Sequence, residues 1–166
     1  STVVDENNYH LFKQNKITPI IPRTTGFGKR IDFLEKGEWV AFGLEELKTT
    51  VIDGYEQSHV TYPENIFDFS KIDITKLKKF NPNTITNKEV NILIDIANGH
   101  MSYLYELVDD LKKLYPKSQI MIGNIANPET YKDCCEAGVD YVRLGIGGGS
   151  GCLTASNTAI FYPMAT

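Results

Sequence analysis

The sequence lacks any apolar run long enough to cross a lipid bilayer, which argues against a membrane-spanning helix. Its first residues, 1–8, are polar and acidic and lack the pattern of a secretory signal peptide. It also lacks an excess of basic residues. The formal net charge of −4 disfavours non-specific binding to nucleic acid, which depends on a basic surface. We therefore expect a cytoplasmic protein that binds neither membranes nor nucleic acid.

Cysteine is scarce, with three residues in 166. Two of them, Cys134 and Cys135, are adjacent, and the third is Cys152. This number and spacing exclude a disulfide framework and a Cys-x-x-Cys metal knuckle, and they suit a reducing compartment. We interpret Cys134 and Cys135 as helix-packing residues rather than metal ligands.

The most informative stretch lies near the end of the sequence, where an apolar segment runs directly into a glycine-rich one. Residues 141–146 are apolar except for Arg143 and predict a buried strand. The glycines that follow are Gly145, Gly147, Gly148, Gly149 and Gly151. Glycine lets successive backbone N–H groups converge on an anion, and N–H dipoles near Cys152 favour its thiolate. We interpret the stretch as an anion-binding loop with a candidate nucleophile; the alternative is a flexible linker with an incidental cysteine.

The first half of the sequence gives weaker signals. Residues 1–16 have no sustained periodicity, and we expect them to be an extended lead-in. We then expect a strand at 18–22, a helix at 30–36, a strand at 39–42 and a helix at 44–52. The segment 53–88 is rich in Asn, Pro, Thr and Lys and supports no particular element.

From residue 90 the pattern becomes regular. We expect strands at 90–97, 119–123 and 140–146, separated by helices at 101–115 and 127–138. Strands that alternate with helices through short loops imply a parallel sheet with right-handed crossovers. Ligands bind beyond the carboxyl ends of such strands, where three polar segments lie: 95–100, 123–127 and 145–154. This pattern alone does not distinguish a barrel from an open, doubly wound sheet.

Three segments carry a resemblance to a known family. They are Leu93-Ile-Asp-Ile-Ala-Asn-Gly-His100, Met121-Ile-Gly-Asn-Ile-Ala126, and Val142 to Thr154 followed by Tyr162-Pro163-Met164. In order and spacing they resemble the IMP dehydrogenase/GMP reductase family. The resemblance implies a (β/α)8 TIM barrel, with residues 1–166 forming one partial catalytic domain up to the cysteine loop. Within it, residues 1–89 are the divergent front part and 90–166 carry the β/α units.

The resemblance also implies a reaction. Cys152 attacks C2 of a purine nucleotide, IMP or GMP, while a nicotinamide cofactor, NAD or NADPH, exchanges hydride at that carbon. Thr154 assists proton transfer. The implied substrate residues are Ser150, Gly149 and Asn124, and the implied cofactor residues are Asp95, Asn98 and Gly99. The carbonyls of Gly147, Gly149 and Cys152 match positions where relatives bind a monovalent cation such as potassium, and relatives form homo-tetramers.

Several residues have a second interpretation. Asp95 could be a structural carboxylate, and one of Asn124 and Asn127 is expected to be only a helix cap. His100 is interpreted as a loop residue rather than a base, and Arg23 as a solvated loop arginine rather than an anion ligand. The sequence leaves open whether the protein is a dehydrogenase, a reductase or a catalytically silent relative that binds nucleotide.

Overall fold

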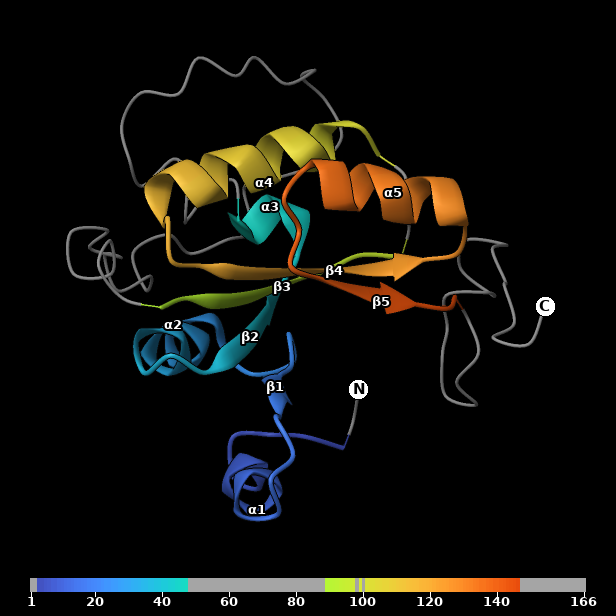
Figure 1. Ribbon diagram of the computed structural model, residues 1–166. Coiled ribbons are helices and arrows are strands. Elements are labelled where there is room, and N and C mark those ends of the chain that lie inside the picture. Colours follow the sequence, from blue (N-terminus) through green and yellow to red (C-terminus); the bar gives the residue numbers. More distant parts are fainter. Residues whose placement is uncertain (1–2, 48–88, 98, 100, 147–166) are drawn as a thin grey trace, which may run out of the picture.

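The computed structural model describes residues 3–47, 89–97, 99 and 101–146. Helices and strands alternate along this part of the chain (Figure 1). In order they are α1 (Tyr9–Gln14), β1 (Ile20–Ile21), α2 (Phe27–Glu35), β2 (Trp39–Phe42), α3 (Leu44–Glu46), β3 (Asn91–Asp95), α4 (Tyr103–Leu114), β4 (Gln119–Ile125), α5 (Pro128–Glu136) and β5 (Tyr141–Leu144). The strands and helices expected after residue 90 are all present, but the expectation that the strand at 141–146 is buried is wrong, because Tyr141 and Leu144 of β5 are 47% and 55% exposed.

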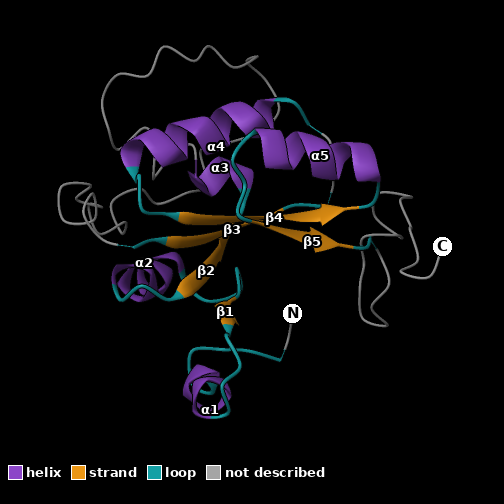
Figure 2. Cartoon of the chain, in the orientation of Figure 1, coloured by secondary structure: helices purple, strands orange, loops and turns teal. Residues whose placement is uncertain are grey.

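The strands form one parallel sheet in the order β1-β2-β3-β4-β5. An open, doubly wound sheet reverses its strand order at a switch point, and this sheet does not. Helices α4 and α5 lie along one face of the sheet (Figure 2), and buried side chains of both, such as Leu107 and Cys134, belong to one hydrophobic core. The topology is therefore that of a singly wound β/α barrel.

The sheet also curls. Trp39 on β2 and Tyr141 on β5 meet edge to face with ring centroids 5.6 Å apart, although β3 and β4 lie between their strands. In a flat sheet these strands would be about 14 Å apart, three times the spacing between neighbours. The two rings can meet only if the sheet wraps around a concave inner face. The predicted TIM-barrel fold class is thus confirmed, with the chain covering part of the barrel.

The two faces of the sheet have different roles. The outer face packs against the helices through a core of fully buried aliphatic side chains. From the strands and α4 this core includes Ile92, Ile94, Ile120, Ile122, Leu104, Leu107, Val108 and Leu111. Each such side chain stabilises the fold by about 1.5–3 kcal/mol on burial. The inner face carries Trp39 and Tyr141, and strand alternation puts Arg143 on the same face, two residues beyond Tyr141.

The prediction for residues 1–16 is wrong, because Tyr9–Gln14 is helical. The Asp5 carboxylate accepts the N–H groups of Asn7 and Asn8, both at 2.8 Å, just before the helix. The Tyr9 ring then packs against Phe33 of α2 with centroids 4.8 Å apart. A helix of six residues is too short to show periodicity, and tertiary contacts stabilise it instead.

The second helix begins earlier than expected. It starts at Phe27 rather than Arg30, with Gly26 at its N-cap. Arg30, which the sequence suggested as a first-turn residue, is 2% exposed. The part of the expected 44–52 helix that begins at residue 48 lies outside the described residues.

Candidate functional site

Three neighbouring strands bring polar side chains together at their carboxyl ends. Asp95 ends β3, Asn124 is next to last in β4, and Arg143 lies in β5. The register aligns Asp95 with Gly123 and Gly123 with Arg143, so these residues form one row across the sheet. By strand alternation the row belongs to the inner face, where a barrel binds its ligands at this end.

The Arg143 guanidinium joins the two polar side chains of the neighbouring strands. One terminal nitrogen donates to Asp95 Oδ1, and Nε donates to Asn124 Oδ1 at 2.9 Å. The side chains of Arg143 and Asp95 are 39% and 34% exposed, so the pair remains accessible from the mouth of the sheet. A planar guanidinium can make both bonds at once because its donors form a rigid fork.

Gly123 provides the space for this contact. A Cβ at Gly123 would lie 2.5 Å from Arg143 Cβ and 3.0 Å from Arg143 Nε. Real Cβ atoms essentially never approach to the first of these distances. Arg143 can therefore reach across to Asp95 only because the residue between them has no side chain.

Asn124 owes its orientation to a break in the register. Gly123 pairs with Arg143 and Ile125 pairs with Leu144, which leaves Asn124 as an extra residue in β4. Such a bulge re-aims a side chain. The Asn124 amide nitrogen donates to the Gly145 carbonyl, at the point where β5 leads into the glycine-rich segment. The peptide bond between Gly123 and Asn124 is cis.

Gly99 lies against the same strand. Its N–H donates to the Asn124 carbonyl at 3.0 Å, and a Cβ at this position would lie 2.4 Å from Ile125 Cγ2. The structure thus brings Asp95, Gly99 and Asn124 together at one end of the sheet, and their roles in binding stay predictions. The other predicted site residues lie outside the described part of the chain: Asn98, Gly147, Gly149, Ser150, Cys152 and Thr154. The proposed cation site lies there too.

Arg143 is a site residue to which the sequence pattern gives no role. In the sequence it is only the charged residue that interrupts an apolar segment. One arginine in an otherwise apolar strand, with one aspartate in a neighbouring strand of the same sheet, is a signal for such a pair, since opposite charges on adjacent strands attract.

The two asparagines separate as expected. Asn127 is the cap: its Oδ1 accepts the Thr130 N–H at 2.8 Å, and Pro128 follows at the first helical position. Asn124 is not a cap.

The two cysteines of α5 also differ, since Cys134 is fully buried and Cys135 is exposed. No group of three or more His, Cys, Asp or Glu residues suited to a metal ion occurs within the described ranges.

The ends of β1 and β2 carry a second charged cluster. Arg30 donates to Glu46 through both terminal nitrogens, and Arg23 Nε lies 3.6 Å from Glu46 Oε2. The Arg23 side chain is 48% exposed, in agreement with its interpretation as a loop arginine. Burial alone would raise the pKa of Glu46, but hydrogen bonds from Arg30 and the Gly43 N–H, with the two arginine charges, hold it below 4.5.

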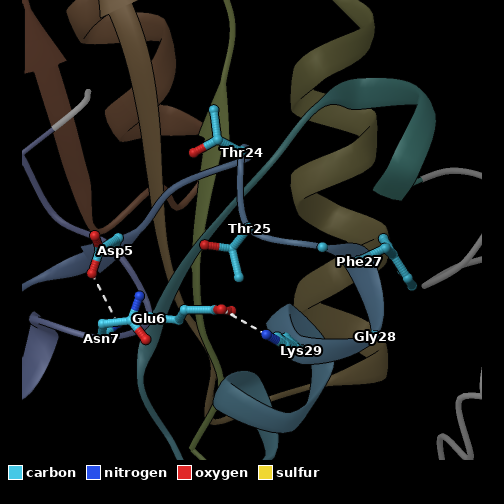
Figure 3. A pocket seen from close by; sticks show the side chains of 9 residues that line it. Asp5, Glu6, Asn7, Thr24, Thr25, Phe27, Gly28 and Lys29 are labelled. Atoms are coloured by element: carbon cyan, nitrogen blue, oxygen red, sulfur yellow. Dashed lines mark hydrogen bonds and ion pairs between the residues drawn. The ribbon is translucent and has the colours of Figure 1, made fainter.

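An open hollow of about 520 Å³ lies at the start of α2 (Figure 3). It is lined by residues 5–7 and 24–29. Lys29 pairs with Glu6 at 2.6 Å across it, and Asp5 adds a second carboxylate. One lysine against two carboxylates leaves this hollow negative, which does not suit an anionic nucleotide.

In the described part of the chain, no helix is both long and apolar enough to span a membrane.

Comparison with known proteins identifies relatives of this chain. The family model for the "IMP dehydrogenase / GMP reductase domain" matches residues 72–166. GMP reductase 2 of Mus musculus is 38% identical over 72 residues, which are 43% of this chain and 21% of the relative. Inosine-5'-monophosphate dehydrogenase of Chlorobaculum tepidum is 37% identical over 75 residues, which are 45% and 15%. The chain thus spans about a fifth or less of the length of these relatives.

A solved structure is also similar. It is GMP reductase from Trypanosoma brucei in complex with guanosine 5'-triphosphate, 32% identical with a TM-score of 0.40. The similarity covers 43% of this chain and 18% of that one.

Proposed function

The chain belongs to the IMP dehydrogenase/GMP reductase family, and we propose that the protein carrying it is a purine nucleotide oxidoreductase that uses a nicotinamide cofactor. The observation that carries the proposal is the cluster of Asp95, Asn124 and Arg143 at the carboxyl ends of three adjacent parallel strands. This cluster lies where β5 enters the segment that contains Cys152. A barrel places its chemistry at this end.

In the proposed reaction Cys152 is the nucleophile. Its thiolate adds to C2 of the purine, and the covalent bond divides one difficult substitution into two easier steps. In the dehydrogenase direction IMP is oxidised at C2 and water releases XMP. In the reductase direction GMP loses ammonia and is reduced to IMP. Thr154 assists the proton transfers in either direction.

The remaining residues bind and orient. Ser150, Gly149 and neighbouring amides hold the 5'-phosphate, and Asn124 orients the purine. We further propose that the carbonyls of Gly147, Gly149 and Cys152 bind a monovalent cation, since hard cations prefer oxygen ligands.

The residues on one side of the site fit a nicotinamide cofactor. The Asp95 carboxylate is 34% exposed at the mouth of the sheet, and a carboxylate suits the hydroxyl groups of a ribose. Gly99 lies against β4 close to Asn124 and presents no side chain to a ligand. We therefore propose that Asp95, Asn98 and Gly99 hold the nicotinamide cofactor, NAD or NADPH. When bound, the nicotinamide supplies hydride exchange at C2.

Cys152→Ala tests the proposal in the whole protein. We expect the variant to bind IMP or GMP as the wild type does, because the phosphate contacts remain, and to lose turnover, because alanine cannot form the adduct. The measurements are nucleotide affinity by calorimetry and cofactor absorbance with IMP and NAD or with GMP and NADPH. Cys135→Ala is the matched control, since it removes an exposed thiol from α5.

Three outcomes separate the alternatives. Normal turnover by Cys152→Ala would contradict the covalent mechanism. A wild-type protein that binds nucleotide without turnover with either pair would be a silent relative. Turnover with only one pair would identify the protein as dehydrogenase or reductase.

A further inference from the structure

Both polar atoms of the Asn124 side chain are engaged by the protein. Oδ1 accepts from Arg143 Nε at 2.9 Å, and Nδ2 donates to the Gly145 carbonyl. A donor at one end and an acceptor at the other specify which way the amide faces, since a flipped amide would oppose N–H to N–H and oxygen to oxygen. The orientation of Asn124 is therefore set by residues of β5.

Arg143 is suited to this task by its shape as well as its charge. Nε and a terminal nitrogen lie on the same planar group, one bonded to Asn124 and the other to Asp95. Lysine has the same charge but a compact ammonium on a flexible stem, without a planar fork. Lysine at position 143 could neutralise Asp95 without fixing the Asn124 amide.

Gly123 completes the arrangement. It lies between Asp95 and Arg143 in the register, and an added Cβ would meet the Arg143 side chain at 2.5 Å. Alanine at 123 would therefore push the Arg143 side chain, from its Cβ outward, away from β4 without changing any charge.

We propose that Arg143 is a positioning residue that fixes the orientation of the Asn124 amide, and that Gly123 is required for it to do so. Arg143 acts through Asn124 and needs no contact of its own with a substrate. The inference deepens the proposed function, and only its consequence for turnover rests on that function. The amide orientation itself can be tested in any case.

The expected consequence is mainly on the rate of the chemical step. Misplacing an orienting group by about 1 Å can cost about 100-fold in rate. The 5'-phosphate is assigned to other residues, so the affinity for nucleotide should change little. We expect kcat to fall about 10- to 100-fold and KM for the nucleotide to stay within about threefold.

Two variants and one control make the test. Arg143→Lys keeps the charge and removes the fork, whereas Gly123→Ala keeps Arg143 and blocks its path. Lys113→Met is the control, since Lys113 is 67% exposed and pairs with Asp109 on the surface of α4. All are first compared with the wild type by thermal unfolding, and Arg143→Lys serves alone if Gly123→Ala fails to fold.

The first readout is the side-chain amide signal of Asn124 in ¹⁵N–¹H spectra of the whole protein, assigned by its loss in Asn124→Asp. In the wild type and in Lys113→Met we expect protected amide protons. In Arg143→Lys and Gly123→Ala we expect hydrogen exchange at least about tenfold faster, because the amide has lost its fixed partner. Unchanged exchange in Arg143→Lys would overturn the proposal whether or not the protein turns over.

The second readout is steady-state turnover with IMP and NAD and with GMP and NADPH. Full kcat in Arg143→Lys would show that charge alone suffices and would also overturn the proposal. If the wild type has no turnover while the amide exchange responds as expected, the positioning role stands and the proposed function fails. The two failures are thereby distinguishable.

Discussion

Asn124 and Asn127 lie three positions apart, and their surroundings give the same side chain two different roles. Asn127 is the N-cap of α5, and its side-chain oxygen accepts a hydrogen bond from the Thr130 N–H. Asn124 lies at a bulge in β4 and bonds to Arg143 and Gly145 of the next strand. The first role is local and supports a helix, and the second is tertiary and supports the site.

The local role predicts a loss of stability without a loss of function. Asn127→Ala should lower the free energy of unfolding by about 1 kcal/mol, because one N–H of the first turn loses its acceptor. Urea denaturation followed by circular dichroism measures the change. Lys132→Ala, an exposed change on the same helix, should stay within about 0.5 kcal/mol of the wild type. Equal stability of Asn127→Ala and the wild type would contradict the capping role.

The sequence is enough to predict the role of Asn127 but not the role of Asn124. Asn127-Pro128-Glu129 is a local signature, readable over one helical turn. The role of Asn124 depends on Arg143, and Arg143 in turn meets Asp95, which is 48 residues away. Which inward-facing residues share a row is set by strand register and by the bulge at Asn124. Neither can be read from a local pattern.

At the scale of elements, one buried arginine connects several elements from the first part of the chain. Arg30 of α2 donates to the carbonyls of Thr25 and Ala41, both at 2.9 Å, and to Glu46 of α3. Its guanidinium also lies 5.3 Å from the Phe27 ring centroid and 5.2 Å from that of Phe42. The loop after β1, the end of β2 and the helix α3 therefore share one anchor.

This anchor makes stability depend on pH. The pKa of Glu46 is lowered in the folded protein, so its ionised form stabilises the fold fully above 4.5, the ordinary value. That contribution is lost as the pH falls below 4.5 and through the lowered folded-state pKa. We expect Glu46→Gln to have a lower free energy of unfolding than the wild type at pH 7. This difference in free energy, the gap between the two proteins, should narrow as the pH falls below 4.5.

Urea denaturation at a series of pH values between 7 and 3 measures the gap. Glu136→Gln, which changes an exposed carboxylate at the end of α5, should give a gap near zero throughout. A Glu46→Gln gap that stays constant down to pH 3 would show that its ionisation does not support the fold.

Whether a helix can be predicted from the sequence depends on its length. The twelve residues of α4 repeat an apolar face often enough for periodicity to reveal the helix. The six residues of α1 do not, and that helix depends on Tyr9 packing against Phe33. The buried position of Arg30 was equally hidden, because its partners come from the loop after β1, from β2 and from α3.

At the scale of the molecule, the contact between Trp39 and Tyr141 reports the curvature of the sheet. Trp39 is the only tryptophan in the sequence and is 9% exposed. Its emission therefore monitors whether β5 remains curled over β2.

Tyr141→Ala should shift this emission to longer wavelength, because water reaches the indole once the covering ring is removed. The contact should also contribute about 0.5–1.5 kcal/mol to stability beyond the buried area. Tyr131→Ala is a matched control, since Tyr131 is 50% exposed, close to the 47% of Tyr141, but lies on α5. Fluorescence spectra in buffer and across a urea titration measure both effects. An unshifted spectrum for Tyr141→Ala would mean that the two rings do not meet in solution.

The absent side chain of Gly123 has a consequence for how this protein can change over time. Positions 123 and 143 face each other, and the space that one leaves is filled by the other. An added Cβ at 123 would lie 2.5 Å from Arg143 Cβ and 3.2 Å from the Arg143 carbonyl oxygen, and every residue except glycine has both of these atoms. A smaller side chain at 143 therefore does not make room for a larger residue at 123. Descendants of this sequence that keep this strand pairing are confined to glycine at 123 for as long as any residue other than glycine occupies 143.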